Sequence, residues 1–542
     1  MPQRILILGG GFAGMYAARE IRKRLGDSVE VELINDENYF VFQPLLPEVG
    51  AGSITALHAV SPLRFLLKGV FIRKARVHSV DQDRKVVTVF QGVQRRPTEV
   101  PYDHLIVTMG QRVDLTRTPG LTEHALTMKT LNDARRLRSH VLERLEHAEI
   151  TQLPEVKKEA LTFCVVGAGF SGVETVGEMK EMIDRSLKYY PNISADEVRV
   201  VLVEFADRVL GELPEKLGTY TAKKLQERGI EVMLNTGVAS ATGTRLITTT
   251  GEEIPTRTIV ATIGNAPSKV VQDMDLPKSH GRIEVGRDLR VVGRDDIWSL
   301  GDCALIPMKE DATERADFAP PTAQFAVREA RTLAKNIAAA LAGKALKPFQ
   351  YKSQGALASL GARRGVAQVW GMNFSGFFAW ILWRAYYVSF LPGTGTKIRV
   401  LLNWLLDDLS PRSVVQASSY TPPAARYAHY RAGDRVFEKG NRADGLYTVI
   451  SGQMELRYED EDTGEVKVWN VGPGEHFGER LILGQDRRSG TVRALEDSKV
   501  LIVDREEFLK LAEGFPVLSD YFQTRMKEAY GIEWVPPANW AA

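Results

Sequence analysis

Two stretches of the chain share one pattern, in which a short apolar run is followed at once by glycines and then by helical periodicity. The runs Arg4–Leu8 and Phe163–Val166 predict buried strands, and the hexapeptides GGGFAG and GAGFSG after them predict tight turns that open helices. Glycines at these spacings permit the turn, the close approach of a pyrophosphate, and the packing of helix on strand. We therefore expect two dinucleotide sites. The fingerprint glycines are Gly9, Gly11, Gly14, Gly167, Gly169 and Gly172.

The strand that follows each fingerprint indicates the nucleotide. Val198–Val203 ends at Glu204, whose carboxylate can accept hydrogen bonds from an adenosine ribose and would repel a 2′-phosphate, which favours NADH over NADPH. The alternative is a surface glutamate at a strand end. After the first fingerprint, Val29–Ile34 runs into Asn35 and Asp36, and either residue can take the ribose.

Three further turns extend these sites. One predicted strand ends at Gly301 and Asp302, a pair that binds the ribityl and pyrophosphate portion of FAD in flavoproteins of this architecture. Thr108 and Gly110 follow another buried strand, and we expect them to close the adenosine side of the same site. Gly264 stands at the matching place in the second unit. The first site is therefore predicted to hold FAD.

The most apolar part of the chain is Trp370–Phe390, which Arg384 interrupts. Its uninterrupted part, Phe374–Trp383, is shorter than the roughly 20 residues that cross a bilayer. A second helix is predicted over Lys397–Leu409, with its apolar residues on one side. We favour monotopic attachment of this pair to a membrane. A buried helical hairpin or a dimer seam is the alternative.

The composition changes over residues 417–428, which read as a linker rich in Ser, Pro and Ala. Beyond it, short alternating strands at regular spacing predict a small β-barrel or jelly roll. A lid helix is predicted around Leu518–Tyr530, and no helix-turn-helix is expected after it. This argues against a transcription factor.

Composition limits the chemistry. The chain has 542 residues, and its 70 basic and 68 acidic side chains give a net charge of +2, so we expect no nucleic-acid partner. Cys164 and Cys303 form no CxxC pair, which disfavours dithiol or sulfide chemistry and indicates a reducing compartment. The first strand begins at Arg4, so no leader segment is expected, and no metal site is predicted.

Three segments carry a more specific signal, NYFVFQPLLPEV at 38–49, GVE at 172–174 and PPTAQFAVR at 320–328. With them the chain resembles the type II NADH dehydrogenases over about residues 4–415. The resemblance implies that two electrons pass from NADH through FAD to a membrane quinone without proton pumping. It also implies that Gln43, Ala323 and Gln324 bind the flavin cofactor.

The quinone-side motif of that family, AQxAxQ, ends here in Arg328 instead of glutamine. A cation there could pair with a carboxylate, bind a quinone oxygen or change the acceptor. The resemblance places Glu174, in the first turn of the second fingerprint helix, near the nicotinamide or the quinone; alternatively it only stabilises the positive helix end. We predict Glu174, Gln324 and Arg328 as the catalytic residues.

Two segments of the predicted barrel, GEHFGER at 474–480 and RRSGTV at 487–492, resemble the cyclic nucleotide-binding domain. The resemblance covers residues 430–530. It implies that Glu479 accepts from the ribose, that Arg488 pairs with the phosphate, and that Ser489 and the backbone near Gly478 complete the anion site. Ser489 favours cAMP over cGMP. A barrel that binds no nucleotide, or only docks a partner, is the alternative.

These predictions define an α/β protein with two Rossmann-like dinucleotide-binding domains, a helical membrane-facing segment and a β-barrel or jelly-roll domain. We expect a peripheral NADH:quinone oxidoreductase on the cytoplasmic face of the cell membrane, with cAMP as effector and a homodimer as one assembly. A cyclic-nucleotide and redox sensor, or a dehydrogenase with a non-quinone acceptor, are the alternatives. The predicted domains are 1–112 with 275–348 for FAD, 113–274 for NADH, 349–416 facing the membrane, the linker 417–428, and 429–535 for the cyclic nucleotide.

Overall fold

The first fingerprint lies in a seven-stranded sheet of the computed structural model, which describes residues 2–410, 412–416, 425–459, 466–480, 487–514 and a few positions between 517 and 527. Five strands are parallel in the order β21-β8-β1-β2-β5, and β6 and β7 form an antiparallel edge. Because β21 joins only after the second fingerprint domain, this unit is discontinuous in sequence. The strands are β1 (Gln3–Leu8), β2 (Val29–Asn35), β5 (Phe71–Asp81), β6 (Val86–Gln91), β7 (Arg96–Pro101), β8 (His104–Val107) and β21 (Ile297–Ser299).

The second fingerprint lies in a five-stranded sheet, all parallel, in the order β10-β17-β11-β12-β13. Strand β11 is buried along its whole length, as is β17, which is why the sequence shows continuous apolar runs there. The short antiparallel pair β9 and β18 lies where the chain leaves the first unit and returns to it. The strands are β9 (Gln111–Val113), β10 (Ala125–Thr127), β11 (Thr162–Val166), β12 (Arg199–Val203), β13 (Ile230–Met233), β17 (Thr258–Ala261) and β18 (Asn265–Pro267).

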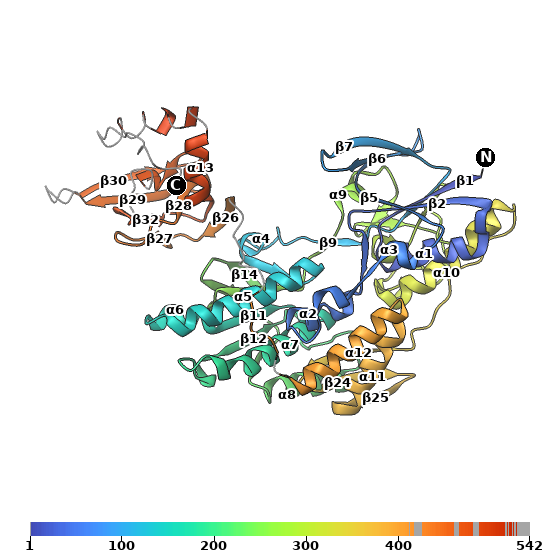
Figure 1. The fold of residues 1–542 in the computed structure, drawn as a ribbon, viewed down its shortest axis with the longest axis horizontal. Helices are drawn as coiled ribbons and strands as arrows, with labels where there is room; N and C mark the ends of the chain where they lie inside the picture. Colours follow the sequence, from blue (N-terminus) through green and yellow to red (C-terminus); the bar gives the residue numbers. More distant parts are fainter. Residues whose placement is uncertain are drawn as a thin grey trace.

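Helices pack on the two sheets, and the short strands around them form smaller sheets (Figure 1). Each fingerprint turn opens a long helix, α1 or α7, and α1 packs against α10. The helices are α1 (Phe12–Leu25), α2 (Leu46–Gly50), α3 (Leu63–Leu66), α4 (Leu121–His124), α5 (Leu131–Ile150), α6 (Pro154–Leu161), α7 (Phe170–Ser186), α8 (Glu215–Gln226), α9 (Lys269–Asp273) and α10 (Ala323–Leu341). The small strands are β3 (Tyr39–Val41), β4 (Val60–Pro62), β14 (Val238–Ala241), β15 (Arg245–Thr248), β16 (Glu253–Pro255), β19 (Lys278–Ser279), β20 (Arg282–Glu284) and β22 (Ala304–Leu305).

After α10 the chain forms a three-stranded antiparallel sheet, β23 (Gly355–Gly361), β24 (Arg364–Val369) and β25 (Met372–Ser375), and then the helices α11 (Gly376–Phe390) and α12 (Thr394–Leu409). These two helices expose apolar side chains, which contradicts their burial as a hairpin inside this chain. In the described part of the chain, no helix combines the length and the hydropathy needed to cross a bilayer. The exposed side chains are Phe377, Phe378 and Ile381 on α11, and Ile398, Leu401, Leu402, Leu405, Leu406 and Leu409 on α12.

The C-terminal domain is a sandwich of two antiparallel sheets, in the orders β26-β33-β28-β31 and β27-β32-β29-β30, followed by α13 (Arg505–Gly514). Positions 425–428 of the predicted linker lie in β26, and its other positions, 417–424, lie outside the described residues. Most of the predicted lid helix also lies outside them. The strands are β26 (Ala425–Tyr430), β27 (Arg435–Phe437), β28 (Gly445–Ser451), β29 (Met454–Glu459), β30 (Val466–Val471), β31 (His476–Phe477), β32 (Gly490–Ala494) and β33 (Ser498–Asp504).

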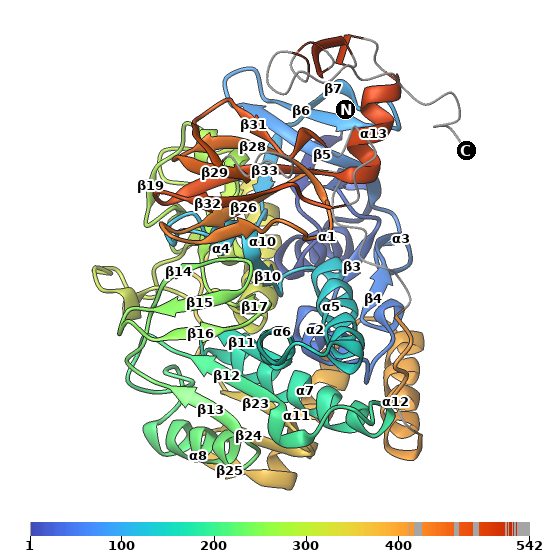
Figure 2. The same ribbon diagram turned by 90° about the vertical axis from the view of Figure 1, so that its left-hand side faces the viewer.

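The C-terminal sandwich, called the barrel from here on, is docked on the second fingerprint domain. It lies beside α4 and β14 and is well separated from α12 (Figures 1 and 2). The Lys499 ammonium lies 2.8 Å from the Glu123 carboxylate at the end of α4. Next to it, the backbone N–H of His429 donates to Nε2 of His124 over 2.9 Å. An ion pair between Arg245 of β15 and Asp434 of the barrel adds a second point of contact. The junction is therefore polar and specific in its pairing.

Candidate functional site

The two fingerprint turns have the same construction. At Gly14 and Gly172 a Cβ atom would lie 1.9 and 1.8 Å from the carbonyl oxygen of the first glycine of the same turn, so only glycine lets the helix pack there. At Gly11 and Gly169, by contrast, a Cβ atom would meet no protein atom within 4 Å. The space next to Gly11 and Gly169 is thus left open at a helix N-terminus, which is what a bound pyrophosphate requires.

A threonine fixes each turn from the neighbouring strand. Thr108 Oγ1 donates to the Leu8 carbonyl over 2.8 Å, and Thr262 Oγ1 donates to the Val166 carbonyl over 2.9 Å. The glycines that follow are Gly110 and Gly264, with φ of 60° and 84°. At Gly264 a Cβ would also lie 2.4 Å from the backbone oxygen of Asp114, so the left-handed conformation and the close approach both require glycine.

The predicted ribose-binding residues occupy equivalent places at the ends of β2 and β12. Asn35 Oδ1 accepts from the Gly10 N–H over 2.8 Å. The Glu204 carboxylate accepts from the backbone N–H groups of Ala168 and Ala206. Asp36 is exposed, so Asn35 is the residue that lies against the first turn. An acid in one unit and an amide in the other is the main chemical difference between the two sites.

Acidic and basic groups gather at Gly301 and Asp302, in the turn that follows β21. The Lys129 ammonium lies 3.8 Å from the Asp302 carboxylate, and the Gly301 N–H donates to Glu329 over 2.8 Å. Burial raises the pKa of Asp302, and burial raises that of Glu329 to about 8. Gln43 joins this cluster, because its side-chain amide donates to the Lys129 carbonyl over 3.3 Å. No sequence pattern predicted Lys129 or Glu329, which reach the site from neighbouring elements.

Glu174 is the fifth residue of α7 and is almost completely buried, with 5% of its surface exposed. Its carboxyl oxygen Oε1 accepts from the Ser359 N–H over 3.0 Å and from the Trp383 indole over 2.8 Å. The C-terminal sheet and α11 therefore hold this side chain, rather than the N-terminal amides of its own helix. Burial raises the pKa of Glu174 to about 8, so the carboxyl holds a proton at neutral pH.

Two more buried carboxyls lie next to it. Glu178, one helical turn along α7, has its pKa raised by burial to about 7. Glu48 of α2 accepts from the Trp404 indole over 3.0 Å, and burial together with the Glu178 charge raises its pKa well above the ordinary value. The Arg412 guanidinium lies 3.6 Å from Glu178. These contacts join residues more than 200 positions apart. Although Glu48 lies in the segment 38–49 quoted above, no sequence motif predicted its pairing with Trp404 or that of Glu178 with Arg412.

Gln324 and Arg328 stand one turn apart at the start of α10. The Gln324 amide donates to the Gly355 carbonyl over 2.9 Å and accepts from the Tyr351 hydroxyl over 3.1 Å. The Arg328 guanidinium lies 4.7 Å from the Tyr351 ring centre and 5.4 Å from that of Phe390. Its charge is thus placed on aromatic faces. Ala323, the first residue of α10, is partly exposed.

Glu174 and Arg328 lie at different points under α11. The helix contacts Glu174 through Trp383 and Arg328 through Phe390, and seven residues of α-helix span about 10 Å. The structure therefore brings the three predicted catalytic residues to one segment, β23 with α11, but does not bring Arg328 into contact with Glu174.

In the barrel, Glu479, Arg488 and Ser489 line one cavity of about 30 Å³ together with Gly478. Arg488 is engaged there by protein groups. Its guanidinium lies 2.6 Å from the Asp444 carboxylate and donates to the carbonyls of Gly478 and Gly445. An anion that binds at this guanidinium therefore competes with the Asp444 carboxylate.

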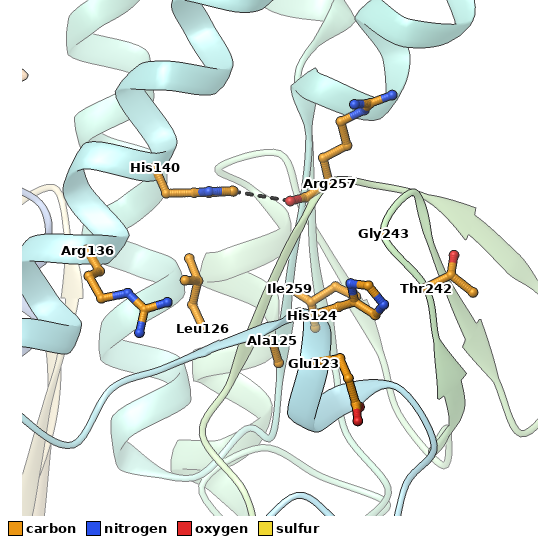
Figure 3. Close-up of a pocket in the computed structure, with 10 residues that line it drawn as sticks. All are labelled: Glu123, His124, Ala125, Leu126, Arg136, His140, Thr242, Gly243, Arg257 and Ile259. Carbon is orange, nitrogen blue, oxygen red and sulfur yellow. Dashed lines mark hydrogen bonds between the residues drawn. The ribbon is translucent and has the colours of Figure 1, made fainter. Parts of the chain in front are cut away.

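A second cavity, of about 170 Å³, lies beside the junction between the barrel and the second fingerprint domain. Figure 3 shows His140 of α5 reaching across it to the backbone oxygen of Arg257, over 3.1 Å. His124 forms another part of its wall, and burial lowers the pKa of His124 to about 4. Both histidines are therefore neutral at pH 7, since burial also lowers the pKa of His140 to about 3.

Comparison with known proteins agrees with this geometry. Residues 3–330 match the family described as pyridine nucleotide-disulphide oxidoreductase, residues 353–413 match the NDH2 C-terminal domain, and residues 427–514 match the cyclic nucleotide-binding domain. The chain belongs to the pyridine nucleotide-disulphide oxidoreductases.

Its relatives narrow that class. The type II NADH:quinone oxidoreductase Ndh of Mycobacterium tuberculosis is 31% identical over 427 residues, which cover 76% of this chain and 89% of the relative. The external alternative NADH-ubiquinone oxidoreductase of Yarrowia lipolytica is 30% identical over 471 residues, 74% of this chain and 78% of the relative. The chain is thus a member of the type II NADH:quinone oxidoreductase family.

A solved structure supports the fold. NDH2 from Plasmodium falciparum in complex with RYL-552 superimposes with a TM-score of 0.70 at 19% identity, covering 77% of this chain and all of that one. At this identity the likeness concerns the fold alone.

The two described cysteines, Cys164 and Cys303, are both buried and free, and burial raises the pKa of each thiol.

Proposed function

We propose that this protein oxidises NADH and reduces a quinone, with FAD carrying the electrons between them. The observation that carries the proposal is the doubled fingerprint turn, with space kept open over Gly11 and over Gly169, in a chain of this family. When bound, FAD takes a hydride equivalent from NADH and delivers two electrons to the quinone. The chain's own residues then have to bind, orient and supply protons.

The first site suits FAD because its polar groups extend from the fingerprint toward α10. We assign the pyrophosphate to the turn at Gly11, the ribose to Asn35, and the ribityl chain to Gly301 and Asp302. The cluster of Lys129, Asp302 and Glu329 supports this assignment, since it supplies both donors and acceptors in a buried place.

The second site suits NADH. Glu204 is held against the turn by two backbone N–H groups, so its carboxylate cannot swing away from an incoming ribose. A 2′-phosphate would meet this negative charge. The Arg208 guanidinium donates to the Gly211 carbonyl of its own loop over 2.9 Å, so the preference is argued from Glu204 alone. We therefore assign NADH, and not NADPH, as the electron donor.

Reduction of a quinone to a quinol consumes two protons, so a water-poor site needs a group that carries a proton at neutral pH. Glu174 has this property, with a pKa of about 8. Glu178 stands one turn further along α7 with a pKa of about 7, where it can give up and regain a proton near physiological pH. We assign Glu174 as the residue that holds the proton on the quinone side, resupplied through Glu178.

Gln324 and Arg328 form the other part of the proposed quinone side. Gln324 is fixed by Gly355 and Tyr351 and can line the flavin edge. The Arg328 cation lies on two aromatic rings, Tyr351 and Phe390, a surface on which a planar quinone ring could also stack. Its charge would attract a quinone oxygen as negative charge develops there.

The exposed apolar side chains of α11 and α12 support attachment to a membrane. They form a surface that includes Leu409, which is 76% exposed, and they stand beside the proposed quinone side at Phe390. An apolar surface of this kind is unusual for a protein surrounded by water. Peripheral attachment through these helices would let a membrane quinone enter without leaving the lipid. We place the enzyme at the cytoplasmic face of the cell membrane.

The barrel is proposed to bind a cyclic nucleotide, with cAMP favoured by Ser489. Glu479, Arg488 and Ser489 line one cavity, which supports the assignment. Because Arg488 is paired with Asp444, the cyclic phosphate would have to take the place of that carboxylate. Titration calorimetry of the full-length protein with cAMP tests the site, and Arg488→Ala should abolish the binding. Unchanged affinity in that variant would contradict the assignment.

The enzymatic proposal is tested with the purified FAD-loaded protein, a short-chain quinone and NADH, with and without cAMP. We expect NADH oxidation that depends on the quinone. Loss of the flavin's visible absorbance on adding NADH, without reoxidation by quinone, would instead favour another acceptor or a sensor role.

A further inference from the structure

A groove of about 450 Å³ opens between α1, α10 and the turn that joins α11 to α12. Four cationic side chains line it, and no carboxylate is among its described lining residues. We call it the basic groove. Its cations are Arg19, Arg328, Arg331 and Lys397.

The cations are held in place by their surroundings. The Arg19 guanidinium lies 4.3 Å from the Tyr16 ring centre and 3.8 Å from the Glu20 carboxylate, which does not line the groove. The Lys397 ammonium donates to the Ser389 carbonyl over 3.0 Å. Tyr16 in turn donates to the Phe390 carbonyl over 3.4 Å, which ties α1 to the end of α11. Arg331 also lines the groove and is exposed to solvent. Contacts within the protein thus hold the side chains of Arg19 and Lys397, while Arg331 remains accessible.

The groove also contains the N-terminus of α12. Gly393 and Thr394 line it, and a helix of 16 residues adds the positive end of its dipole to the four cations. The exposed apolar strip of α12 begins at Ile398, directly after Lys397. An anion bound in the groove would therefore sit where the apolar strip begins.

An anionic group joined to apolar chains has this distribution of charge and hydrophobicity. We propose that the basic groove binds the phosphate headgroup of an anionic membrane phospholipid whose acyl chains lie along α11 and α12. Arg suits phosphate through its forked donors, and several cations are needed because the groove is open to water. This inference rests on the proposed membrane attachment and adds to it a dependence on lipid charge.

Flotation of the FAD-loaded full-length protein with vesicles tests the proposal. One set contains phosphatidylcholine alone, and the other contains phosphatidylcholine mixed with phosphatidylglycerol. The wild type should bind both sets, and the anionic set more tightly. R331Q should weaken binding to the anionic vesicles about five-fold or more, and should leave binding to the neutral vesicles unchanged. FAD content confirms that each variant is folded.

R399Q is the matched control, because Arg399 is also exposed and lies on α12 itself but outside the groove. If attraction depends only on general surface charge, R399Q should lose as much affinity as R331Q, and that result overturns the proposal. Equal binding of the wild type to both vesicle sets also overturns it, while leaving membrane attachment intact. Failure to float with either set contradicts attachment itself.

A kinetic measurement separates the lipid from the quinone. R331Q should reduce a water-soluble quinone with wild-type kcat and KM, since Arg331 is not among the residues assigned to the reaction. A rise in the KM for that quinone, parallel to the loss of vesicle binding, would show that the groove receives the quinone instead of a phospholipid.

Discussion

Replacing Glu174 with glutamine tests the chemistry and the electrostatics of the buried carboxyl at once. Glutamine keeps an oxygen to accept from Ser359 and from Trp383, at the present 3.0 and 2.8 Å, but cannot ionise. The folded pKa of about 8 exceeds the ordinary 4.5, so the folded protein binds this proton more tightly than the unfolded chain does. The resulting stabilisation is complete below 4.5 and disappears as the pH rises through 8.

The size of the effect follows from that shift. A difference from 4.5 to about 8 corresponds to an upper bound of roughly 5 kcal/mol of unfolding free energy lost by the wild type at high pH. E174Q does not incur this loss. The difference in unfolding midpoint between E174Q and the wild type should therefore move in favour of E174Q between about pH 6 and about pH 9. Thermal unfolding of the FAD-loaded protein across this range measures it.

The kinetic consequence is separate. Loss of a positioned acid costs a factor on the order of 10² to 10⁴, so the quinone-dependent kcat of E174Q should fall at least about 100-fold. The rate at which NADH reduces the flavin, followed by the loss of its visible absorbance, should stay at the wild-type value. E329Q provides a comparison, because that carboxyl also has a pKa of about 8 and should show the same pH-dependent gain in stability. A variant E174Q with wild-type turnover and a wild-type pH profile of stability would refute the reasoning.

Four further variants test the nucleotide sites and the junction. G169A should raise the KM for NADH at least about ten-fold with the fold intact, since its Cβ meets open space. G172A should fail to fold, because its Cβ would lie 1.8 Å from a carbonyl oxygen. Measurements of activity and of FAD content distinguish these two outcomes. D444N, which removes the carboxylate 2.6 Å from Arg488, should tighten cAMP binding about ten-fold in calorimetry, and weaker binding would contradict the proposed replacement. K499E sets a negative charge against Glu123 and should abolish any response of turnover to cAMP while the basal rate stays unchanged; a retained response would show that the junction is not used.

The buried strands could be predicted from the sequence almost to the residue. The run Phe163–Val166 became β11 (Thr162–Val166), and Val198–Val203 became β12 (Arg199–Val203). These strands are covered on both faces, so their composition is fixed by burial alone. The fingerprint glycines could be predicted equally well, because a Cβ clash of the kind seen at Gly14 excludes every residue except glycine.

The proton-bearing cluster could not be predicted in the same way. Glu48 lies in the segment 38–49 that carried the family resemblance, but nothing in that segment indicates its partners, and Trp404 and Arg412 belong to no motif. They meet because the C-terminal segment folds back over α2 and α7, a tertiary contact across more than 350 residues between Glu48 and Trp404. The ion pair between Arg488 and Asp444 could not be predicted for a related reason. It depends on a neighbouring loop and not on the motif that contains Arg488.

The position of the barrel gives the proposed regulation a physical route. The barrel contacts the core at Glu123 and His124, and the chain continues from there through β10 to Lys129, whose ammonium lies 3.8 Å from Asp302. Lys129 follows His124 by only five positions in the sequence. A cyclic nucleotide would change turnover only if it bound two arrangements of the barrel with different affinity. Displacement of His429 from His124 is such a difference, because a buried neutral imidazole would lose its backbone donor. Strand β10 begins at the next residue and ends two positions before Lys129.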